Sequence, residues 1–563
     1  MLPLLLLACG EDVDTPAASV PEGCDPLILE VCALPFPSTA MMTPDDTTAS
    51  GWRMAIPEAG LPVDIDGVVT DPWAWNERDG FSTWGPLVFW LADLGDVPGH
   101  EAVGEQAIVS VIDVETGESV PVWLEPDAAA EDPDQRTVAV RFAAPMRHGA
   151  RHVVAVRGLT DSAGSAISDM EIPASRADYY ASDILPVLAD AGIETDGLQL
   201  AWDFVTHSTD SALGVAEFLR EDAAAQPSPT HTITEVLDAD CAEEGVTIGR
   251  TIEGTVTAPS YLTDDGELLT RDADGMPVLS DTVEVDFIAQ IPCSLLADPR
   301  PALTIQFGHG LLGSREESTQ AYLGELLDDH SAVMIASDWR GMSKDDRGDI
   351  TLMMATDLGM FPRVPERTLQ GFVELDTVMR HLQEGGFDDE PALMVGDVAV
   401  IDPAQTTFYG ISQGGIIGVG YLGFSQRLSR GGVSVPGGPF TTIMPRSIHF
   451  DAFRLILETR YPDARDVAVM LGVLETLWEP AEGSGWVSSM DDDVLIQTAT
   501  GDAQVSAFAS HNIARALDAR SVAPQIREIW GVDEADGGFS GSAIAEWRYL
   551  DGGEDPETGV SAD

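Results

Sequence analysis

The chain has 563 residues, of which 44% are hydrophobic, and its 29 basic and 95 acidic side chains give a formal charge of −66. A chain of this length is too long to fold around one ordinary hydrophobic core, so about two to four domains are expected. The negative charge excludes unassisted binding to nucleic acid or anionic lipid through surface charge. Acidic residues are spread along the whole chain, which indicates a solvated surface.

The N-terminus has the pattern of an export signal. The residues before Cys9 are apolar, and Leu6-Leu7-Ala8-Cys9 fits a bacterial lipobox, in which the cysteine is lipidated. The run is too short to span a bilayer, and it lacks a basic n-region, as a misplaced start codon would produce. We predict an exported, membrane-anchored bacterial lipoprotein at the cell surface or in the periplasm, with residues 1–23 as signal and tether.

Four further cysteines agree with export, because an even number suits disulfides in an oxidising compartment. Three pairings are possible. We predict Cys24–Cys32, which closes a short loop, and Cys241–Cys293, which ties the start of a second region to a later strand. A metal site at these cysteines is disfavoured because no C-x-x-C spacing or histidine cluster accompanies them. No metal or organic cofactor is expected, because the serine mechanism predicted below requires none.

Short β-type runs with turn residues between them fill residues 24–175. The clearest runs are 107–112, 137–142 and 152–156, and their regular spacing predicts an N-terminal, Ig-like β-sandwich domain. Residues 176–230 then have a helix, strand and helix pattern and end in the Pro-containing stretch AAAQPSPT. We predict that they form a helical connector and linker.

Longer apolar strands alternate with helical segments over residues 231–563. The runs 303–307, 332–336, 406–409 and 494–498 are each followed by a polar motif. This alternation predicts an α/β fold with a doubly wound, mostly parallel sheet, in which ligands bind at the carboxyl ends of the strands. The segment 440–490 is rich in large apolar residues and forms either a cap over an acyl pocket or ordinary helical packing.

The run YGISQGG contains Gly410-Ile411-Ser412-Gln413-Gly414, a G-x-S-x-G motif. The motif alone is weak, but a strand precedes it and an apolar helix pattern follows at once. That context predicts a sharp turn that presents Ser412 as a nucleophile, with Gly410 and Gly414 at positions where a Cβ atom would collide. The alternative is a glycine-rich turn without chemistry.

An acyl-transfer site also needs two donors for the oxyanion. We predict the amides of Gln413, which follows the serine, and of Leu311, in the loop after an earlier strand. That loop contains His309-Gly310, an HG element, and His309 is expected to shape the turn rather than act as the base.

Chain order places the acid after the serine and the base after the acid. Asp502 follows a strong strand and is the predicted acid, although a helix N-cap would also explain it. His511 is the only later histidine. It is a weak candidate for the base because it falls inside an expected helix, where the alternative is a surface position. Either the sequence stops before a C-terminal piece that carries the base, or activity has been lost or altered.

The motifs together resemble the bacterial virulence-factor lipase family of surface lipoproteins, which have an α/β-hydrolase fold. The resemblance rests on LPFPSTAMMTPDD, NERDGFSTWGPLVFW, LAWDFVTHS, GHGLLGS, YGISQGG and TGDAQVS. It implies lipase or lysophospholipase activity and gives Ser412, Asp502, Leu311 and Gln413 the roles derived above. The base has no matching position.

These observations predict an exported serine ester hydrolase that acts on an ester or lipid and contacts the membrane through its anchor. A non-catalytic surface binding protein is the rival hypothesis, supported by the missing histidine. A peptidase on the same scaffold is the third, since it would use the same serine chemistry.

Overall fold

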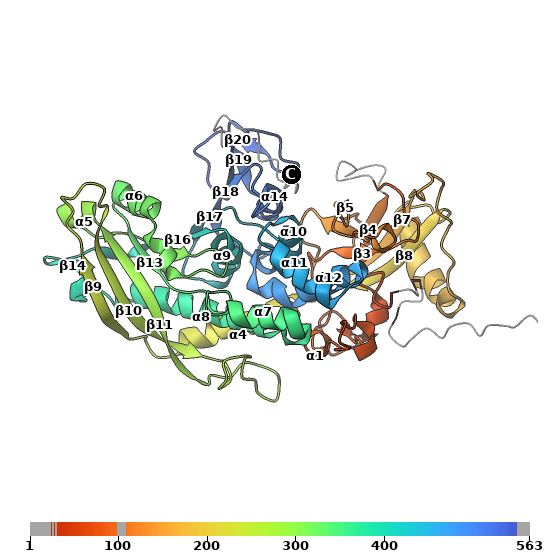
Figure 1. Ribbon diagram of the computed structural model, residues 1–563, viewed down its shortest axis with the longest axis horizontal. Coiled ribbons are helices and arrows are strands. Elements are labelled where there is room, and N and C mark those ends of the chain that lie inside the picture. The colour runs from red at the N-terminus through yellow and green to blue at the C-terminus, as the bar shows by residue number, and fades with distance from the viewer. Residues whose placement is uncertain (1–23, 25–26, 29–30, 98–107, 549–563) are drawn as a thin grey trace, which may run out of the picture.

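The computed structural model describes Cys24 and residues 27–28, 31–97 and 108–548 (Figure 1). The predicted lipidation site Cys9, the tether and the last residues of the chain lie outside this part. The largest element is an 11-stranded sheet with the order β20-β19-β21-β18-β17-β16-β12-β13-β11-β10-β9. Its strands are β9 (His231–Asp238), β10 (Ile248–Ser260), β11 (Asp281–Pro292), β12 (Ala302–Gly308), β13 (Val333–Ala336), β16 (Ile401–Ile411), β17 (Arg430–Ser434), β18 (Asp493–Ala499), β19 (Arg520–Val522), β20 (Glu534–Ala535) and β21 (Ala543–Trp547).

All neighbouring strands from β13 to β20 pair in parallel, whereas β9, β10 and β11 pair antiparallel at the other edge. The chain passes from β12 to β13 on one side and then crosses back to β16 on the other. This reversal makes β12 a topological switch point, where ligands bind in such sheets. The predicted α/β-hydrolase fold with a mostly parallel sheet is confirmed.

Helices cover both faces of the sheet, which explains why the central strand β13 is apolar throughout. All four residues of β13 are buried. Met334 packs with α6 in one cluster, whereas Val333 and Ile335 belong to the main core on the opposite face. The helices of this region are α4 (Thr209–Ala225), α5 (Cys293–Ala297), α6 (Ala321–His330), α7 (Arg347–Thr356), α8 (Arg363–Gln383), α9 (Gln413–Phe424), α10 (Phe440–Ile443), α11 (Asp451–Arg460), α12 (Ala464–Trp478), α13 (Gly483–Trp486) and α14 (Ala507–Ala516).

The N-terminal region contains two three-stranded antiparallel sheets, β3-β6-β5 and β4-β7-β8. Both contribute to one apolar core. The smaller elements here are β1 (Met42–Pro44), β2 (Trp52–Met54), α1 (Trp73–Asn76), α2 (Ala177–Tyr179) and α3 (Leu185–Asp190), and the sheets consist of β3 (Leu87–Phe89), β4 (Val109–Asp113), β5 (Val122–Pro126), β6 (Val138–Phe142), β7 (Arg151–Arg157) and β8 (Leu198–Val205).

Strand β8 corrects the predicted connector. The strand was expected between two helices of residues 176–230, but it pairs with β7 and so belongs to the N-terminal sheets. All eight of its residues are buried. One face of β8 packs into the apolar core of the N-terminal sheets. Its other face is covered by α2 and α3, because Val153 and Ala201 share a cluster with Leu188. The connection to the large sheet is therefore short, from the end of α4 to β9.

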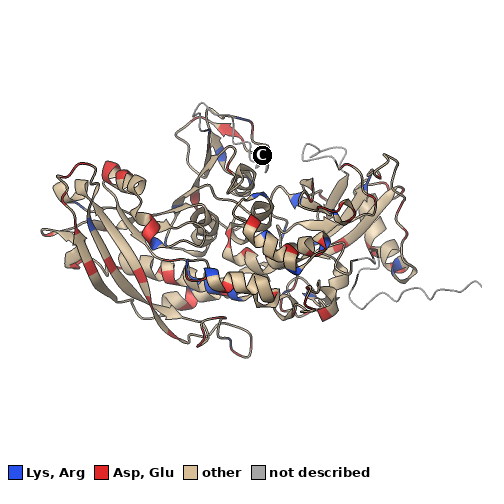
Figure 2. Ribbon diagram, in the orientation of Figure 1, with Lys and Arg blue, Asp and Glu red and all other residues tan. Residues whose placement is uncertain are grey.

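The N-terminal region with its two three-stranded sheets, hereafter the N-terminal module, packs against the segment between β17 and β18. The indole Nε1 of Trp75 donates to the carbonyl of Val473 at 2.8 Å. The amide of Thr83 donates to Glu479 Oε2 at 3.0 Å, and its hydroxyl donates to Oε1. Burial acts to raise the pKa of Glu479, but its interactions with His207, His148 and Ser82 together outweigh burial and lower that pKa to about 2. Acidic side chains lie on elements throughout the molecule (Figure 2).

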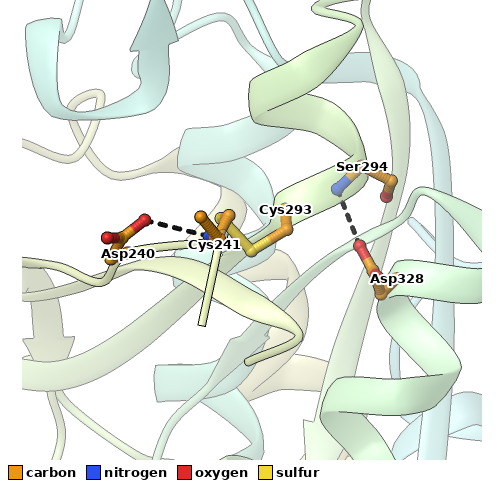
Figure 3. Close-up of a disulfide and its surroundings, with 6 residues drawn as sticks. Asp240, Cys241, Cys293, Ser294 and Asp328 are labelled. Carbon is orange, nitrogen blue, oxygen red and sulfur yellow. Dashed lines mark hydrogen bonds between the residues drawn. A yellow bond between two sulfur atoms is a disulfide. The ribbon is translucent and has the colours of Figure 1, made fainter. Parts of the chain in front are cut away.

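Both predicted disulfides are present, Cys24–Cys32 and Cys241–Cys293. Figure 3 shows the second, which joins the loop after β9 to the start of α5. Beside it, the amide of Ser294 donates to Asp328 Oδ1 at 2.7 Å. The bond thus fastens the antiparallel edge of the sheet near α5 and α6.

Removing the Cys241–Cys293 bridge is expected to lower the free energy of unfolding by about 2 to 4 kcal/mol, because the bridge closes a long loop in the unfolded chain. Its sequence separation is 52 residues, against 8 for Cys24–Cys32. Urea unfolding of the C241A/C293A double variant measures this loss. A smaller effect than that of C24A/C32A would contradict the prediction.

Within the described residues, no helix combines the length and apolarity required to cross a bilayer.

Candidate active site

Ser412 occupies the sharp turn between β16 and α9. Its backbone has φ 57° and ψ −122°, a conformation that is strained for a residue with a side chain. The turn is held because the Ser412 amide donates to the carbonyl of Ser434 at 2.9 Å, and the amides of Gly415 and Ile416 donate to the Ser412 carbonyl at 2.8 and 2.9 Å. This geometry is that of a nucleophile elbow, which holds the serine side chain above the carboxyl end of the sheet.

Two glycines allow this turn to lie against the neighbouring strand. A Cβ atom on Gly410 would lie 2.0 Å from the carbonyl oxygen of Gly414. A Cβ atom on Gly414 would lie 2.1 Å from the carbonyl oxygen of Gly308, at the end of β12. Both obstacles are backbone atoms that cannot move aside. The start of α9 therefore contacts the end of β12 directly.

That contact brings the predicted oxyanion donors together. The side chain of Gln413 bridges two loops, since its Oε1 accepts from the amide of Leu312 at 3.1 Å and its Nε2 donates to the carbonyl of Met342 at 2.8 Å. Among the hydrogen bonds of the described residues, none uses the amide of Leu311 or of Gln413. Both amides are thus available to an incoming oxygen.

His309 is fixed in place and shapes the loop that carries Leu311. Its Nε2 lies 2.9 Å from the amide of Trp339, which donates to it, and its Nδ1 lies 3.0 Å from the carbonyl oxygen of Gly310. The ring is fully buried, and burial lowers its pKa. The Gly310 amide donates to Glu317 Oε2 at 2.8 Å, which holds the next residue of the loop.

Asp502 follows β18 and is half-buried. Its Oδ1 accepts from the amides of Gln504 and Val505 at 2.7 and 3.0 Å. It is not the N-cap of α14, because Ser506 has that position and accepts from the amide of Phe508. The N-cap alternative for Asp502 is therefore wrong, and its side chain instead orders the loop beside the cavity.

His511 lies inside α14, where the sequence predicted a helix, but its side chain is buried and not on the helix surface. Its Nε2 lies 3.2 Å from Glu546 Oε1 on β21, and Arg527 also contacts that carboxylate. Burial lowers the pKa of His511. The residue does not line the cavity that contains Ser412, so the structure does not bring the two together.

A cavity of about 150 Å³ is lined by Ser412, Gln413 and Leu311. Apolar side chains form most of its remaining wall. Residues 440–490 supply many of them from α10, α11 and α12, opposite α7, and examples are Met354, Phe450, Phe453, Leu474 and Trp478. The sequence allowed two interpretations of residues 440–490, a cap over a pocket or ordinary helical packing. In the structure, this segment forms part of the wall of the cavity that Ser412 also lines.

The sequence reasoning missed His449, which lines this same cavity. His449 lies between β17 and β18, ahead of Asp502 in the chain. An order-based search for the base starts only after the acid and so passes over this residue. The signal available from the sequence was a histidine within the apolar segment that follows the strand after Ser412.

A second feature missed from sequence is a buried pair of glutamates, of which Glu475 lines the cavity. Glu475 Oε2 accepts from the amide of Thr441 at 3.0 Å, and Glu482 Oε1 accepts from the amide of Phe440 at 3.2 Å. Both carboxyls are almost fully buried. Burial raises the pKa of Glu475, and burial together with the charge of Glu475 raises that of Glu482 well above its ordinary value. The raised pKa values favour the protonated form of these carboxyls, and the two hydrogen bonds anchor α10.

Replacing Glu482 with Gln is expected to change how stability depends on pH. The folded-state pKa is raised, so the unfolded chain releases its proton first and wild-type stability falls as pH rises above about 4.5. The glutamine retains a hydrogen-bonding side chain without this titration. Urea unfolding of both proteins at pH 5 and pH 8 should show a smaller decline for E482Q. Equal declines would contradict the raised pKa of Glu482.

Gly414→Ala is expected to lower the free energy of unfolding by about 1 to 3 kcal/mol, because the new methyl group meets the Gly308 carbonyl. Gly214 in α4 is the matched control, since a Cβ atom there has nothing within 4 Å. Gly214→Ala should stabilise by about 0.5 to 1 kcal/mol, the helix preference for alanine. Thermal unfolding of both variants measures the contrast, and a Gly414→Ala variant as stable as wild type would contradict the close contact.

No group of three His, Cys, Asp or Glu side chains that would suit a metal ion occurs among residues of the described ranges. What this site offers chemically is a strained hydroxyl, two open amides and an apolar cavity.

No protein-family model matches the chain, and no curated protein matches it either. Among solved structures, the chain is similar to an acetyl xylan esterase from Paenibacillus sp. R4, with 14% identity, a TM-score of 0.35 and coverage of 61% of this chain and 89% of that one. The chain is also similar to acetyl xylan esterase 1 from Thermoanaerobacterium sp. JW/SL YS485, with 13% identity, a TM-score of 0.35 and coverage of 62% of this chain and 89% of that one.

An acylaminoacyl peptidase from Pyrococcus horikoshii is also similar, with 15% identity, a TM-score of 0.30 and coverage of 56% of this chain and 45% of that one. The α/β-hydrolase architecture rests on the sheet described above. Since one fold supports many reactions, function is argued from the residues of the cavity. The resemblance to virulence-factor lipases stays a prediction.

Proposed function

We propose that this protein is a serine hydrolase of carboxylic esters. The observation that supports this most strongly is the strained position of Ser412 beside two open amides at one apolar cavity. Backbone strain of this kind concentrates at functional sites. A structural turn without chemistry would gain nothing from a strained serine next to unused hydrogen-bond donors.

In the proposed reaction, the Ser412 hydroxyl oxygen bonds to the ester carbonyl carbon while a base takes the hydroxyl proton. The carbonyl oxygen becomes negative and accepts from the amides of Leu311 and Gln413. The bond to the alcohol then breaks, the alcohol leaves with the proton, and water releases the acyl group by the same route. Asp502 orients the base.

The cavity wall favours an apolar acyl group. Its side chains are mainly Met, Leu, Ile and Phe, contributed by α7 and by the segment between β17 and β18. Burial of aliphatic carbon against such a surface contributes about 25 cal/mol per Å². An acyl ester or lipid fits this surface better than a charged peptide, in agreement with the lipase resemblance of the sequence motifs.

We further propose that the protein acts outside the cytoplasm, attached to a membrane through a lipidated Cys9. The lipobox pattern supports the anchor, and the disulfides Cys24–Cys32 and Cys241–Cys293 support an oxidising compartment. Radioactive palmitate incorporation that depends on Cys9 would establish the anchor.

Hydrolysis of p-nitrophenyl acyl esters and labelling by a fluorophosphonate test the proposed activity. Ser412→Ala should abolish labelling and lower kcat/KM by about 10⁴- to 10⁶-fold, because the nucleophile is removed. Ser506→Ala, at the α14 N-cap, is the control and should keep both.

An unlabelled and inactive wild type would contradict the proposal. Faster cleavage of peptide amides than of esters by the labelled wild type would identify a peptidase in place of an esterase.

A further inference from the structure

The proposed reaction needs a base, and most histidines of the described chain are committed elsewhere. His309 and His511 are fixed by the contacts given above. His148 stacks on His207 with ring centroids 5.6 Å apart, and His207 lies 3.2 Å from the buried Glu479. The remaining rings lie away from the cavity: His152 is buried against Phe204, His231 bonds to His381 and Glu390, and His330 ends α6.

His449 differs from all of these because it lines the cavity together with Ser412. It lies just before α11, in the segment that covers the serine, and its side chain is exposed. The same cavity is lined by Gln504 and Val505, which follow Asp502. Nucleophile, imidazole and acid loop therefore face one space.

The backbone ties His449 to the acid loop. The amide of Ile448, which precedes His449, donates a hydrogen bond to the carbonyl of Ala503, which follows Asp502, at 3.0 Å. The His449 amide donates to Ser447 Oγ at 3.3 Å, which fixes the turn. The segment that carries His449 is thereby held beside the loop of the predicted acid, although the two residues are 53 positions apart in the chain.

Asp502 retains a free oxygen for this role. Its Oδ1 is engaged by the amides of Gln504 and Val505. Among the hydrogen bonds of the described residues, none uses Oδ2. A carboxylate with one oxygen anchored by its own loop and the other open can orient an imidazole on the neighbouring segment.

We propose that His449 is the general base of the hydrolase reaction, an inference that rests on the proposed function. One ring nitrogen takes the proton of Ser412 as its oxygen bonds to the carbonyl carbon. The resulting imidazolium, stabilised by Asp502, returns that proton to the departing alcohol. In the second half-reaction the same nitrogen takes a proton from water and returns it to Ser412.

This assignment places the base on the covering segment rather than on the loop after the last strand. Hydrogen bonds of a catalytic base commonly tighten only when the substrate is bound. An acyl group that fills the cavity would contact both Ser412 and the α10–α11 side chains. Substrate binding and assembly of the Ser–His–Asp group are therefore coupled through one segment.

The test compares His449→Ala with wild type in p-nitrophenyl ester turnover and fluorophosphonate labelling. Loss of the base should lower kcat/KM by about 10²- to 10⁴-fold and slow labelling, with KM nearly unchanged. Added imidazole should restore part of the rate in His449→Ala but not in Ser412→Ala. Thermal unfolding checks that the variant folds, which its exposed position favours.

His330→Ala is the matched control, since His330 is an exposed histidine at the end of α6 and does not line the cavity. It should leave turnover and labelling unchanged. A labelled, active wild type whose rate survives His449→Ala within about threefold would overturn this inference and leave the proposed function standing. Wild type that is neither labelled nor active would overturn both.

Discussion

The backbone contact between the end of β12 and the start of α9 determines the geometry of the whole site. Gly308 and Gly414 lie so close that no side chain fits between them. Because α9 cannot move away without losing this contact, Ser412 is held at the elbow and the Leu311 loop is held beside it. Two segments about a hundred residues apart in sequence thus meet at the topological switch point of the sheet.

The covering segment connects this site to the N-terminal module. Its far side presents Glu479 to Thr83 and His207, and its near side supplies the apolar wall of the cavity. Buried carboxylates are costly unless they are hydrogen-bonded, and here they accept from backbone amides. The module therefore supports the wall of the cavity, and its apolar side chains share one core with the large sheet. A change at this interface would reach the cavity through α12.

The sequence predicted the parts of the molecule that depend on local patterns. The strands that end before His309, Ser412 and Asp502 were recognised because each is a short apolar run followed by a polar motif, and all three occur in the sheet. The disulfides followed from an even cysteine number. Strand β8 was misplaced because its pairing with β7 depends on residues about 45 positions away, which no local pattern reports.

The sequence by itself determined the fold class, the sharp turn at Ser412 and the loops at the strand ends. These features depend on hydrophobic periodicity and glycine spacing, which involve only residues that are close together in the sequence. Only the tertiary structure decided which side chains share a cavity. His511 follows the acid in sequence yet is buried against Glu546, whereas His449 precedes it and lines the same cavity as Ser412. The physical reason is that a covering segment folds back over the sheet, so proximity at the site depends on packing and not on chain order.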